Sequence, residues 1–247
     1  MKKQEIIDAK NLHYKILNEK IIEAIKSGAD EIILNNINGQ RYIAAGLKDD
    51  ARIIVNGVPG NDLGAFMDGP KIIVNSNAQD VIGNTMNNGK IIVHGSCGDI
   101  TGYGMRAGQI YIKGNAGYRI GIHLKSYKNL LPVIIIGGSV GDFFGEYMGG
   151  GALFVLGLNN NDVKIVGNYI GTGMHAGVIY IRGSVQKYQL GKEVGFAELN
   201  ENDVALFDKY LKDYCDIFDI DYQKLTAEKF TKLIPVSHRP YGKIYAY

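Results

Sequence analysis

Cysteine, net charge and long apolar runs are all scarce in this 247-residue sequence. Its two cysteines, Cys97 and Cys215, lie in different segments and form no disulfide framework. We therefore expect the protein to be located in the reducing environment of the cytoplasm. The net charge is +2 and the Lys and Arg residues are scattered, which argues against a nucleic-acid or membrane-surface role. The sequence contains no apolar run that could span a bilayer and no secretory signal. With 46% hydrophobic residues, the chain can bury a substantial core.

Methionine, in contrast, follows a strict register. Apart from Met1, every methionine stands three residues after a glycine, and the first three of these are 19 residues apart. The last two fit the same frame after insertions of 5 and 7 residues. The pattern comprises Gly64, Met67, Gly83, Met86, Gly102, Met105, Gly145, Met148, Gly171 and Met174, with Gly121 followed by Leu124 in one further repeat. Such a period predicts a solenoid in which these residues have structural roles.

The length of the repeat decides which kind of solenoid is expected. We number each coil from 0 to 18 and start the coils at residues 38, 57, 76, 95, 114, 138 and 164. Positions 15 and 17 are aliphatic in all seven coils, which predicts one short strand per coil. Nineteen extended residues span roughly 60 Å, enough for one circuit of a narrow β-coil but too short for a helical unit. The predicted fold is a parallel β-helix of about seven coils, with stacked methionines in its core.

A second apolar column points away from this core. Side chains alternate along a strand, so position 16 faces outward when positions 15 and 17 face inward. That position is apolar or aromatic throughout, and we call its residues the outer ladder: Ile54, Ile73, Ile92, Tyr111, Ile135, Phe154 and Tyr180. A sheet that is apolar on both faces is a covered sheet. The chain's own ends or a partner protein are therefore expected to cover the ladder.

Both ends of the chain depart from the repeat. Residues 1–37 are predicted to form a helix and a strand, residues 38–183 the β-helix, and residues 184–247 a helical extension. An amphipathic helix is expected over residues 200–220, and a second helix near residues 226–233. The apolar stripe of the first comprises Val204, Phe207, Leu211, Cys215 and Phe218. These segments would cap the open ends of the β-helix, and the C-terminal helix would cover part of the outer ladder.

Candidate catalytic or metal-binding residues are few. An acidic column at position 4 comprises Asp80, Asp99 and Asp142. Stacked carboxylates could bind a divalent cation or act as an acid/base pair, whereas Asp at a tight corner commonly bonds the backbone. We favour the corner role because other residue types interrupt the column. No His, Cys or carboxylate set has metal-ligand spacing, and no catalytic or cofactor-binding residue is predicted.

Several coils resemble a known family. The segments Gly60-Asn-Asp-Leu-Gly-Ala-Phe-Met67, Asp80-Val-Ile-Gly-Asn-Thr-Met86 and Gly141-Asp-Phe-Phe-Gly-Glu-Tyr-Met148 are similar to the C-terminal GXGXG domain of the glutamate synthase large subunit. Residues 95–105 and 171–174 share the pattern, and the likeness covers roughly residues 30–183. The flanks, including residues 8–14 and 239–242, resemble the stand-alone archaeal and bacterial version. The resemblance implies a right-handed β-helix of about seven coils.

The same resemblance implies a role without catalysis. Members of the family make glutamate from glutamine and 2-oxoglutarate, with a cysteine glutaminase and a synthase domain that carries FMN and an iron-sulfur cluster. The chain starts with Met1 and has too few cysteines for a cluster. The implied role is a scaffold in glutamate biosynthesis that joins glutaminase and synthase subunits of this oxidoreductase complex for ammonia transfer. Self-association remains open.

Three other functions are also open. A similar β-helix occurs in one subunit of the formylmethanofuran dehydrogenases, and a stand-alone form serves in N-methylglutamate synthase. The third alternative, from a different class, is an independent β-helix enzyme that uses stacked carboxylates. Whether Asp80, Asp99 and Asp142 line a cleft or only a turn discriminates this last reading from the scaffold.

Overall fold

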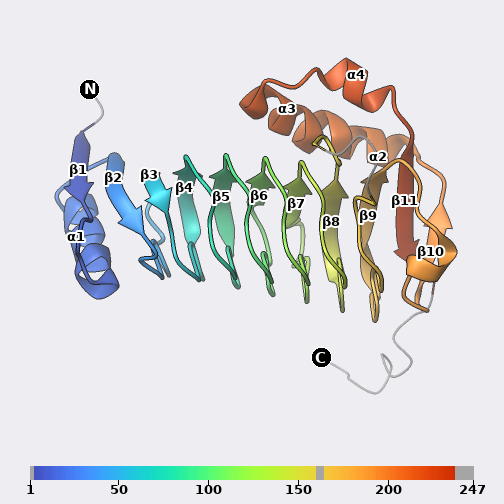
Figure 1. Ribbon diagram of the computed structural model, residues 1–247, viewed down its shortest axis with the longest axis horizontal. Coiled ribbons are helices and arrows are strands. Elements are labelled where there is room, and N and C mark those ends of the chain that lie inside the picture. Colours follow the sequence, from blue (N-terminus) through green and yellow to red (C-terminus); the bar gives the residue numbers. More distant parts are fainter. Residues whose placement is uncertain (1–2, 160–163, 237–247) are drawn as a thin grey trace.

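Parallel strands stacked side by side dominate the protein (Figure 1). The computed structural model describes residues 3–159 and 164–236, so residues 160–162 of the second insertion and the 239–242 motif lie outside it. The strands of the described residues form one sheet, in the order β1-β2-β3-β4-β5-β6-β7-β8-β9-β11-β10. Each predicted coil contributes one strand: β3 (Arg52–Val58), β4 (Asp68–Val74), β5 (Asn88–Val93), β6 (Gln109–Ile112), β7 (Val133–Ile136), β8 (Gly149–Val155) and β9 (Ala176–Arg182).

Residues at the same coil position pair across neighbouring strands. Ile53 lies opposite Ile72, and Ile72 opposite Ile91, in parallel register. The same in-register pairing continues through β9, across both insertions. The coil positions of the strands on either side of each insertion therefore stay in register. Six turns separate β3 from β9, close to the seven coils expected, and the predicted parallel β-helix is confirmed.

The methionine column lies in the core, as the repeat predicts. Met67, Met86, Met105 and Met148 are fully buried, and Met174 is 1% exposed. The six repeat glycines all have positive φ: Gly64, Gly83, Gly102, Gly121, Gly145 and Gly171. A β-carbon at Gly83 would also overlap Cδ1 of Ile110, a core side chain of a later strand. Glycine at this position thus makes the turn possible and leaves room for the core.

The N-terminal flank closes one end of the solenoid. It consists of β1 (Gln4–Asp8), α1 (Tyr14–Lys26) and β2 (Glu31–Asn38). Strand β2 pairs in parallel with β3 on one side and with β1 on the other. Helix α1 buries Leu17, Ile21 and Ala24 against the first core residues. The expected helix and strand are both present, and β2 extends one residue beyond the boundary predicted at residue 37.

A nearly continuous helical segment follows the solenoid at the other end. It comprises α2 (Glu201–Leu206), the π turn η2 (Phe207–Leu211) and α3 (Lys212–Phe218), and Asn200 caps its start. The helix predicted over residues 200–220 is confirmed, but its stripe is wrong at one position. Val204 is 57% exposed, whereas Asp203 is 4% exposed. A π turn takes one more residue per hydrogen-bonded step than an α-turn, so it rotates the preceding residues relative to α3.

The rest of the C-terminal flank is not purely helical. The helix expected near residues 226–233 is wrong: α4 (Tyr222–Thr226) ends early, and β11 (Phe230–Pro235) begins four residues later. Strand β11 lies between β9 and β10 (Val194–Ala197) and is antiparallel to both. The short 3-10 helix η1 (Lys187–Gln189) precedes β10 in the chain. The last strand of a solenoid leaves unpaired backbone N–H and C=O groups, and β11 satisfies them.

The C-terminal helices cover most of the outer ladder (Figure 1). Its last five residues, from Ile92 to Tyr180, are buried in a second apolar core that the helical segment completes with Phe207, Leu211, Cys215 and Phe218. The Tyr214 hydroxyl reaches across this core and donates to the Ile112 carbonyl at 3.0 Å. The first two ladder residues, Ile54 and Ile73, are only half-buried, and of these Ile73 packs against the edge of this core. Coverage by the chain itself is therefore real but incomplete.

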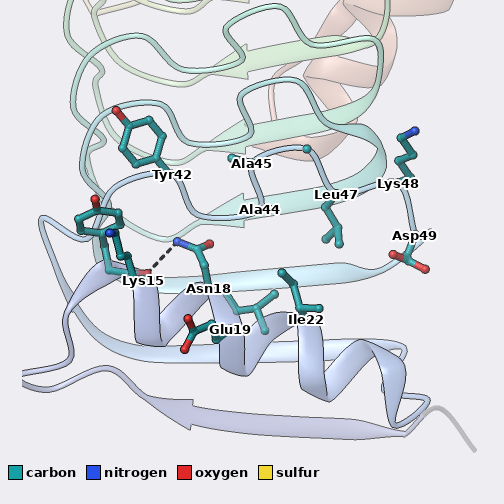
Figure 2. A pocket seen from close by; sticks show the side chains of 13 residues that line it. Lys15, Asn18, Glu19, Ile22, Tyr42, Ala44, Ala45, Leu47, Lys48 and Asp49 are labelled. Atoms are coloured by element: carbon teal, nitrogen blue, oxygen red, sulfur yellow. Dashed lines mark hydrogen bonds between the residues drawn. The ribbon is translucent and has the colours of Figure 1, made fainter.

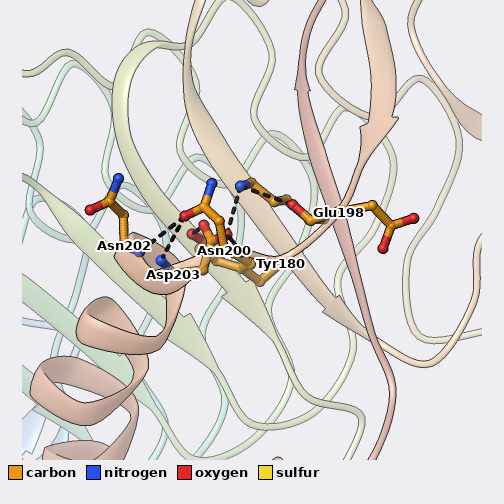
Figure 3. Close-up of polar contacts among 6 residues, drawn as sticks. Tyr180, Glu198, Asn200, Asn202 and Asp203 are labelled. Carbon is orange, nitrogen blue, oxygen red and sulfur yellow. Dashed lines mark hydrogen bonds and ion pairs between the residues drawn. The ribbon is translucent and has the colours of Figure 1, made fainter.

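A buried polar cluster fastens the start of the helical segment to the sheet (Figure 3). Lys232 on β11 lies 2.6 Å from Oδ2 of Asp203, and the Tyr180 hydroxyl donates to Oδ1 of the same carboxylate. The Asn200 backbone N–H donates to Oδ2 at 2.7 Å. Burial raises the pKa of Asp203, but the hydrogen bonds from Lys232 and Tyr180 outweigh it and leave that pKa below its ordinary value. The cluster thus joins the helix to two strands.

Candidate functional site

The acidic column occupies turns between coils. Oδ1 of Asp80 accepts the backbone N–H of Asp99 at 2.9 Å, and Oδ1 of Asp99 accepts that of Tyr118 at 2.8 Å. Oδ1 of Asp142 accepts the Asn168 N–H at 2.7 Å. Each carboxylate therefore bonds the next coil at the same turn. In the part of the chain that the structure describes, no group of three or more His, Cys, Asp or Glu side chains could hold a metal ion.

The glycine that faces each carboxylate from the next coil has a matching reason. A β-carbon on Gly98 would overlap Oδ1 of Asp80, and one on Gly117 would overlap Oδ1 of Asp99. The Gly-Asp pair of the repeat is thus a unit in which the carboxylate of one coil fills the space that the glycine of the next coil leaves open. This arrangement supports the turn itself.

A different group of side chains gathers on the turns. The rings of Tyr103 and His123 lie 5.7 Å apart edge to face, and His123 stacks on Tyr147 at 5.3 Å. All three side chains are exposed, with Tyr147 at 48%. The Tyr147 ring lies where a β-carbon of residue 173 would stand, so Gly173 lets the ring pack against the backbone of the next coil. The result is a ring stack that runs across consecutive coils.

A second stack lies on the same set of coils. The Arg119 guanidinium lies 4.6 Å from the centre of the Phe143 ring, and Phe143 stacks on Tyr169 at 4.9 Å. Arg119 also forms an ion pair with Glu146, whose side chain is buried. Since Glu146 directly precedes Tyr147, this ion pair ties the two stacks together. We call these residues the aromatic face: Tyr103, Arg119, His123, Phe143, Tyr147 and Tyr169.

The backbone explains why the side chains of this face point outward. Arg119, His123, Phe143, Tyr147 and Tyr169 all have positive φ, between 51° and 63°. The N–H groups of the first four donate along the solenoid to carbonyls of the next coil, as those of Arg119 to Asp142 and of Tyr147 to Thr172 do. Left-handed backbone is unusual for bulky residues and costs roughly 1 kcal/mol or more each. The same left-handed backbone recurs at matching turns of other coils, as at Val81, Thr85 and Ile100, so the repeat itself sets the direction of these side chains.

The chemistry of the aromatic face suits binding rather than catalysis. Tyrosine, phenylalanine and arginine are the residue types that dominate binding energy at protein interfaces. Tyr169, within the second stack, is 54% exposed, and Tyr118, also 54% exposed, adds apolar surface next to Arg119. Sequence reasoning missed this face because it searched for titratable clusters. The available signal was the aromatic and basic residues at coil positions 5 and 9, which the repeat places in line.

A cavity of about 670 Å³ lies at the N-terminal end, between α1 and the first coil (Figure 2). Asn18 lies at its centre and donates to the Tyr14 carbonyl at 2.9 Å. Arg41 lies 4.9 Å from the centre of the Tyr14 ring and 5.9 Å from that of Tyr42. Tyr42 shares the positive φ of the aromatic-face turns, so the cavity continues the same side of the solenoid. Its lining is mostly apolar and holds no nucleophile–base pair.

The two cysteines are free and buried. Burial raises the pKa of the Cys97 thiol to about 12 and that of Cys215 to about 11, so neither has the character of a reactive thiolate. In the described part of the chain, the helices are all too short or too polar to cross a membrane.

Comparisons with known proteins agree with the repeat. A family model described as the GXGXG motif matches residues 7–238. An uncharacterized protein of Methanocaldococcus jannaschii is 49% identical over 249 residues, which cover 97% of this chain and 95% of that protein. A chain of the formyltransferase/hydrolase complex from Methylorubrum extorquens, solved with methylofuran, aligns with a TM-score of 0.61 and 19% identity. That alignment covers 92% of this chain and 89% of the other, and it indicates a shared fold.

Proposed function

We propose that this chain, which belongs to the GXGXG motif family, is a scaffold subunit of a glutamate synthase-type complex. The observation that carries the proposal is the aromatic face, an exposed row of rings and one guanidinium on strained backbone. A solenoid holds such a row rigid, so little conformational entropy is lost when a partner binds. Acidic residues that a solenoid enzyme could use are engaged in coil-to-coil bonds.

In this proposal the partners supply the chemistry. A glutaminase-like subunit releases ammonia, and a synthase-like subunit with FMN and an iron-sulfur cluster uses it. The present chain holds the two at a fixed separation and carries no flavin, metal or catalytic residue of its own. Rigidity is what the parallel ladder provides, because each coil is bonded to the next along its whole strand.

Reconstitution tests the proposal. The synthase-like subunit alone should make glutamate from free ammonia and 2-oxoglutarate, with or without this chain. Glutamine-dependent synthesis should require the chain together with both partners. Heat-denatured chain is the control. It shows whether the effect requires the folded chain or any added protein suffices. Equal glutamine-dependent rates with and without the chain would refute the scaffold role.

A second candidate is the β-helix subunit of a formylmethanofuran dehydrogenase or N-methylglutamate synthase complex. The fold likeness to a chain of the formyltransferase/hydrolase complex supports this candidate. In such a complex the β-helix would again be a non-catalytic subunit. The same reconstitution, repeated with the subunits of each complex, discriminates between them. Only the cognate set should form a stable assembly with the chain on a sizing column.

The independent-enzyme alternative has its own test. Asp99→Asn keeps an oxygen that can accept the Tyr118 N–H, so folding should be retained while any carboxylate chemistry is lost. If the purified chain alone cleaved a polysaccharide and Asp99→Asn abolished that activity, the enzyme reading would replace the scaffold.

A further inference from the structure

The outer ladder continues beyond the solenoid into the N-terminal flank. Ile6 pairs with Ile33, Ile33 with Ile54, and Ile54 with Ile73, all in parallel register. Ile6 is 60% exposed, and the other three are half-buried. We call these four residues the bare ladder. It lies at the opposite end of the sheet from the C-terminal helices in Figure 1.

The apolar core of the C-terminal helices reaches as far as Ile73, which is the last residue of the bare ladder on that side. Phe218 at the end of α3 packs beside Ile92, and its ring lies 5.3 Å from His94. Asp219 then adopts left-handed backbone with φ of 57°, which ends the helix. The sheet face itself carries on in the same register past this point. One helix therefore covers one part of a surface that is longer than the helix.

A basic row runs beside the ladder. Arg52, Lys71 and Lys90 lie opposite one another on β3, β4 and β5, two residues before the ladder isoleucines and on the same face. Lys90 lies 2.6 Å from Asp213 of α3, and Arg52 lies 3.2 Å from Glu31. Among the described residues, Lys71 has no carboxylate within ion-pair distance. Burial and the neighbouring charges of Lys90 and Arg52 lower the pKa of Lys71.

We propose that the bare ladder docks an amphipathic helix of a partner protein, with an apolar stripe on Ile33, Ile54 and Ile73 and a carboxylate edge facing Arg52 and Lys71. The pattern is already set by α3, which places apolar side chains on the ladder and Asp213 on Lys90. Rungs repeat every 4.8 Å or so, close to the helix pitch of about 5.4 Å. A carboxylate on successive helical turns thus meets successive basic side chains.

The dimensions fix the size of the partner segment. Three steps from Ile6 to Ile73 span about 14 Å, which a helix of about ten residues covers. A second copy of this chain is a poorer occupant. On this face the carboxylate of Glu31 already lies 3.2 Å from Arg52, and that of Asp8 already accepts hydrogen bonds from Asn36 and Lys10. Two such faces would bring basic side chains and asparagines together without a new counter-charge.

Peptide binding to the full chain tests the proposal, which stands independently of the glutamate synthase assignment. The probe is a fluorescein-labelled synthetic helix of about 18 residues, with a leucine stripe and a glutamate edge. A matched probe has lysine at every glutamate position. Fluorescence anisotropy should give a Kd at least about tenfold lower for the glutamate probe.

Variants then locate the site. Ile54→Asp should raise the Kd of the glutamate probe by about tenfold or more. Lys71→Glu changes an exposed side chain, so folding is retained, and it should reverse the preference between the two probes. Val204→Asp alters an exposed apolar residue on α2 and should leave the Kd within about twofold. Circular dichroism confirms that each variant is folded.

Three results would overturn the proposal. The first is equal affinity for both probes, and the second is an unchanged preference in Lys71→Glu. The third is concentration-dependent dimerisation that Ile54→Asp abolishes and that the glutamate probe does not compete with. That last outcome would assign the bare ladder to a second copy of the chain.

Discussion

The Lys232 ammonium lies 2.6 Å from Oδ2 of Asp203, and both residues are buried. This ion pair links β11 to the first turn of the helical segment, and Tyr180 adds a hydrogen bond from β9. Two charges in a dry environment stabilise a fold only while they remain paired and hydrogen-bonded. The pair therefore makes the C-terminal cover of the outer ladder sensitive to a single side chain.

Removal of the Asp203 carboxylate should be costly. Asp203→Ala leaves Lys232 buried without its counter-ion, and we expect a loss of about 3–5 kcal/mol in the free energy of unfolding. Urea denaturation followed by circular dichroism measures this loss. Asp216→Ala, on the exposed side of α3, is the matched control and should stay within about 0.5 kcal/mol of the wild type. A loss below 1 kcal/mol or so in Asp203→Ala would show that the cluster is dispensable.

The same carboxylate predicts a pH dependence. Because the pKa of Asp203 is lower in the folded chain than in the unfolded one, its stabilisation is fully present above the ordinary value near 4. That stabilisation is lost as the pH falls through the lowered folded pKa. The difference in unfolding free energy between the wild type and Asp203→Ala should therefore be constant from pH 7 to about 5 and shrink below about 4. A constant difference down to pH 3 would contradict the assignment.

The methionine column predicts a contrast between two substitutions at one site. Met105→Asp places a carboxylate in the fully buried core and should cost several kcal/mol in unfolding free energy. Met105→Leu nearly conserves volume and polarity and should cost less than about 1.5 kcal/mol. Thermal melts of both variants provide the measurement. An unchanged melting temperature in Met105→Asp would mean that this residue is not in the core.

Deletion of residues 198–247 should expose the covered part of the outer ladder. Tyr111, Phe154 and Tyr180 would then form an apolar patch larger than a monomer normally leaves bare. We expect aggregation, measured by light scattering during purification. Deletion of residues 237–247 alone is the control, because it leaves α2, α3, α4 and β11 in place. A chain that stays monomeric without residues 198–247 would rule out the cover as the reason for solubility.

The aromatic face should carry partner binding. Tyr147→Ala and Phe143→Ala each remove a stacked ring, and each should weaken association with the cognate subunit by about 30-fold, or roughly 2 kcal/mol. Surface plasmon resonance with the immobilised chain measures the change. Tyr188→Ala, at a tyrosine that is 76% exposed outside the face, serves as the control. Equal losses in all three variants would show that the effect is not specific to this face.

The repeat alone determined the solenoid and the place of its core residues. The 19-residue period fixes which positions turn, which face the core and which form strands. Gly83, Met86 and Ile91 could therefore be assigned to a turn, to the core and to a strand from the sequence, as the structure has them. The acidic column could also be recognised as a turn feature, since Asp99 bonds the backbone one coil away. The GXGXG resemblance came from the same residues.

Only the tertiary structure decided how the ends are used and where the surface sites lie. Asp203, which is buried in place of Val204, has its ion-pair partner Lys232 29 residues away in the sequence. Residues 230–235 form a strand because the backbone groups at the edge of β9 need hydrogen-bond partners. This requirement comes from the tertiary structure and cannot be read from the local sequence. The aromatic face exists because hydrogen bonds between coils hold Phe143 and Tyr147 in left-handed backbone, which brings side chains about twenty residues apart into stacks.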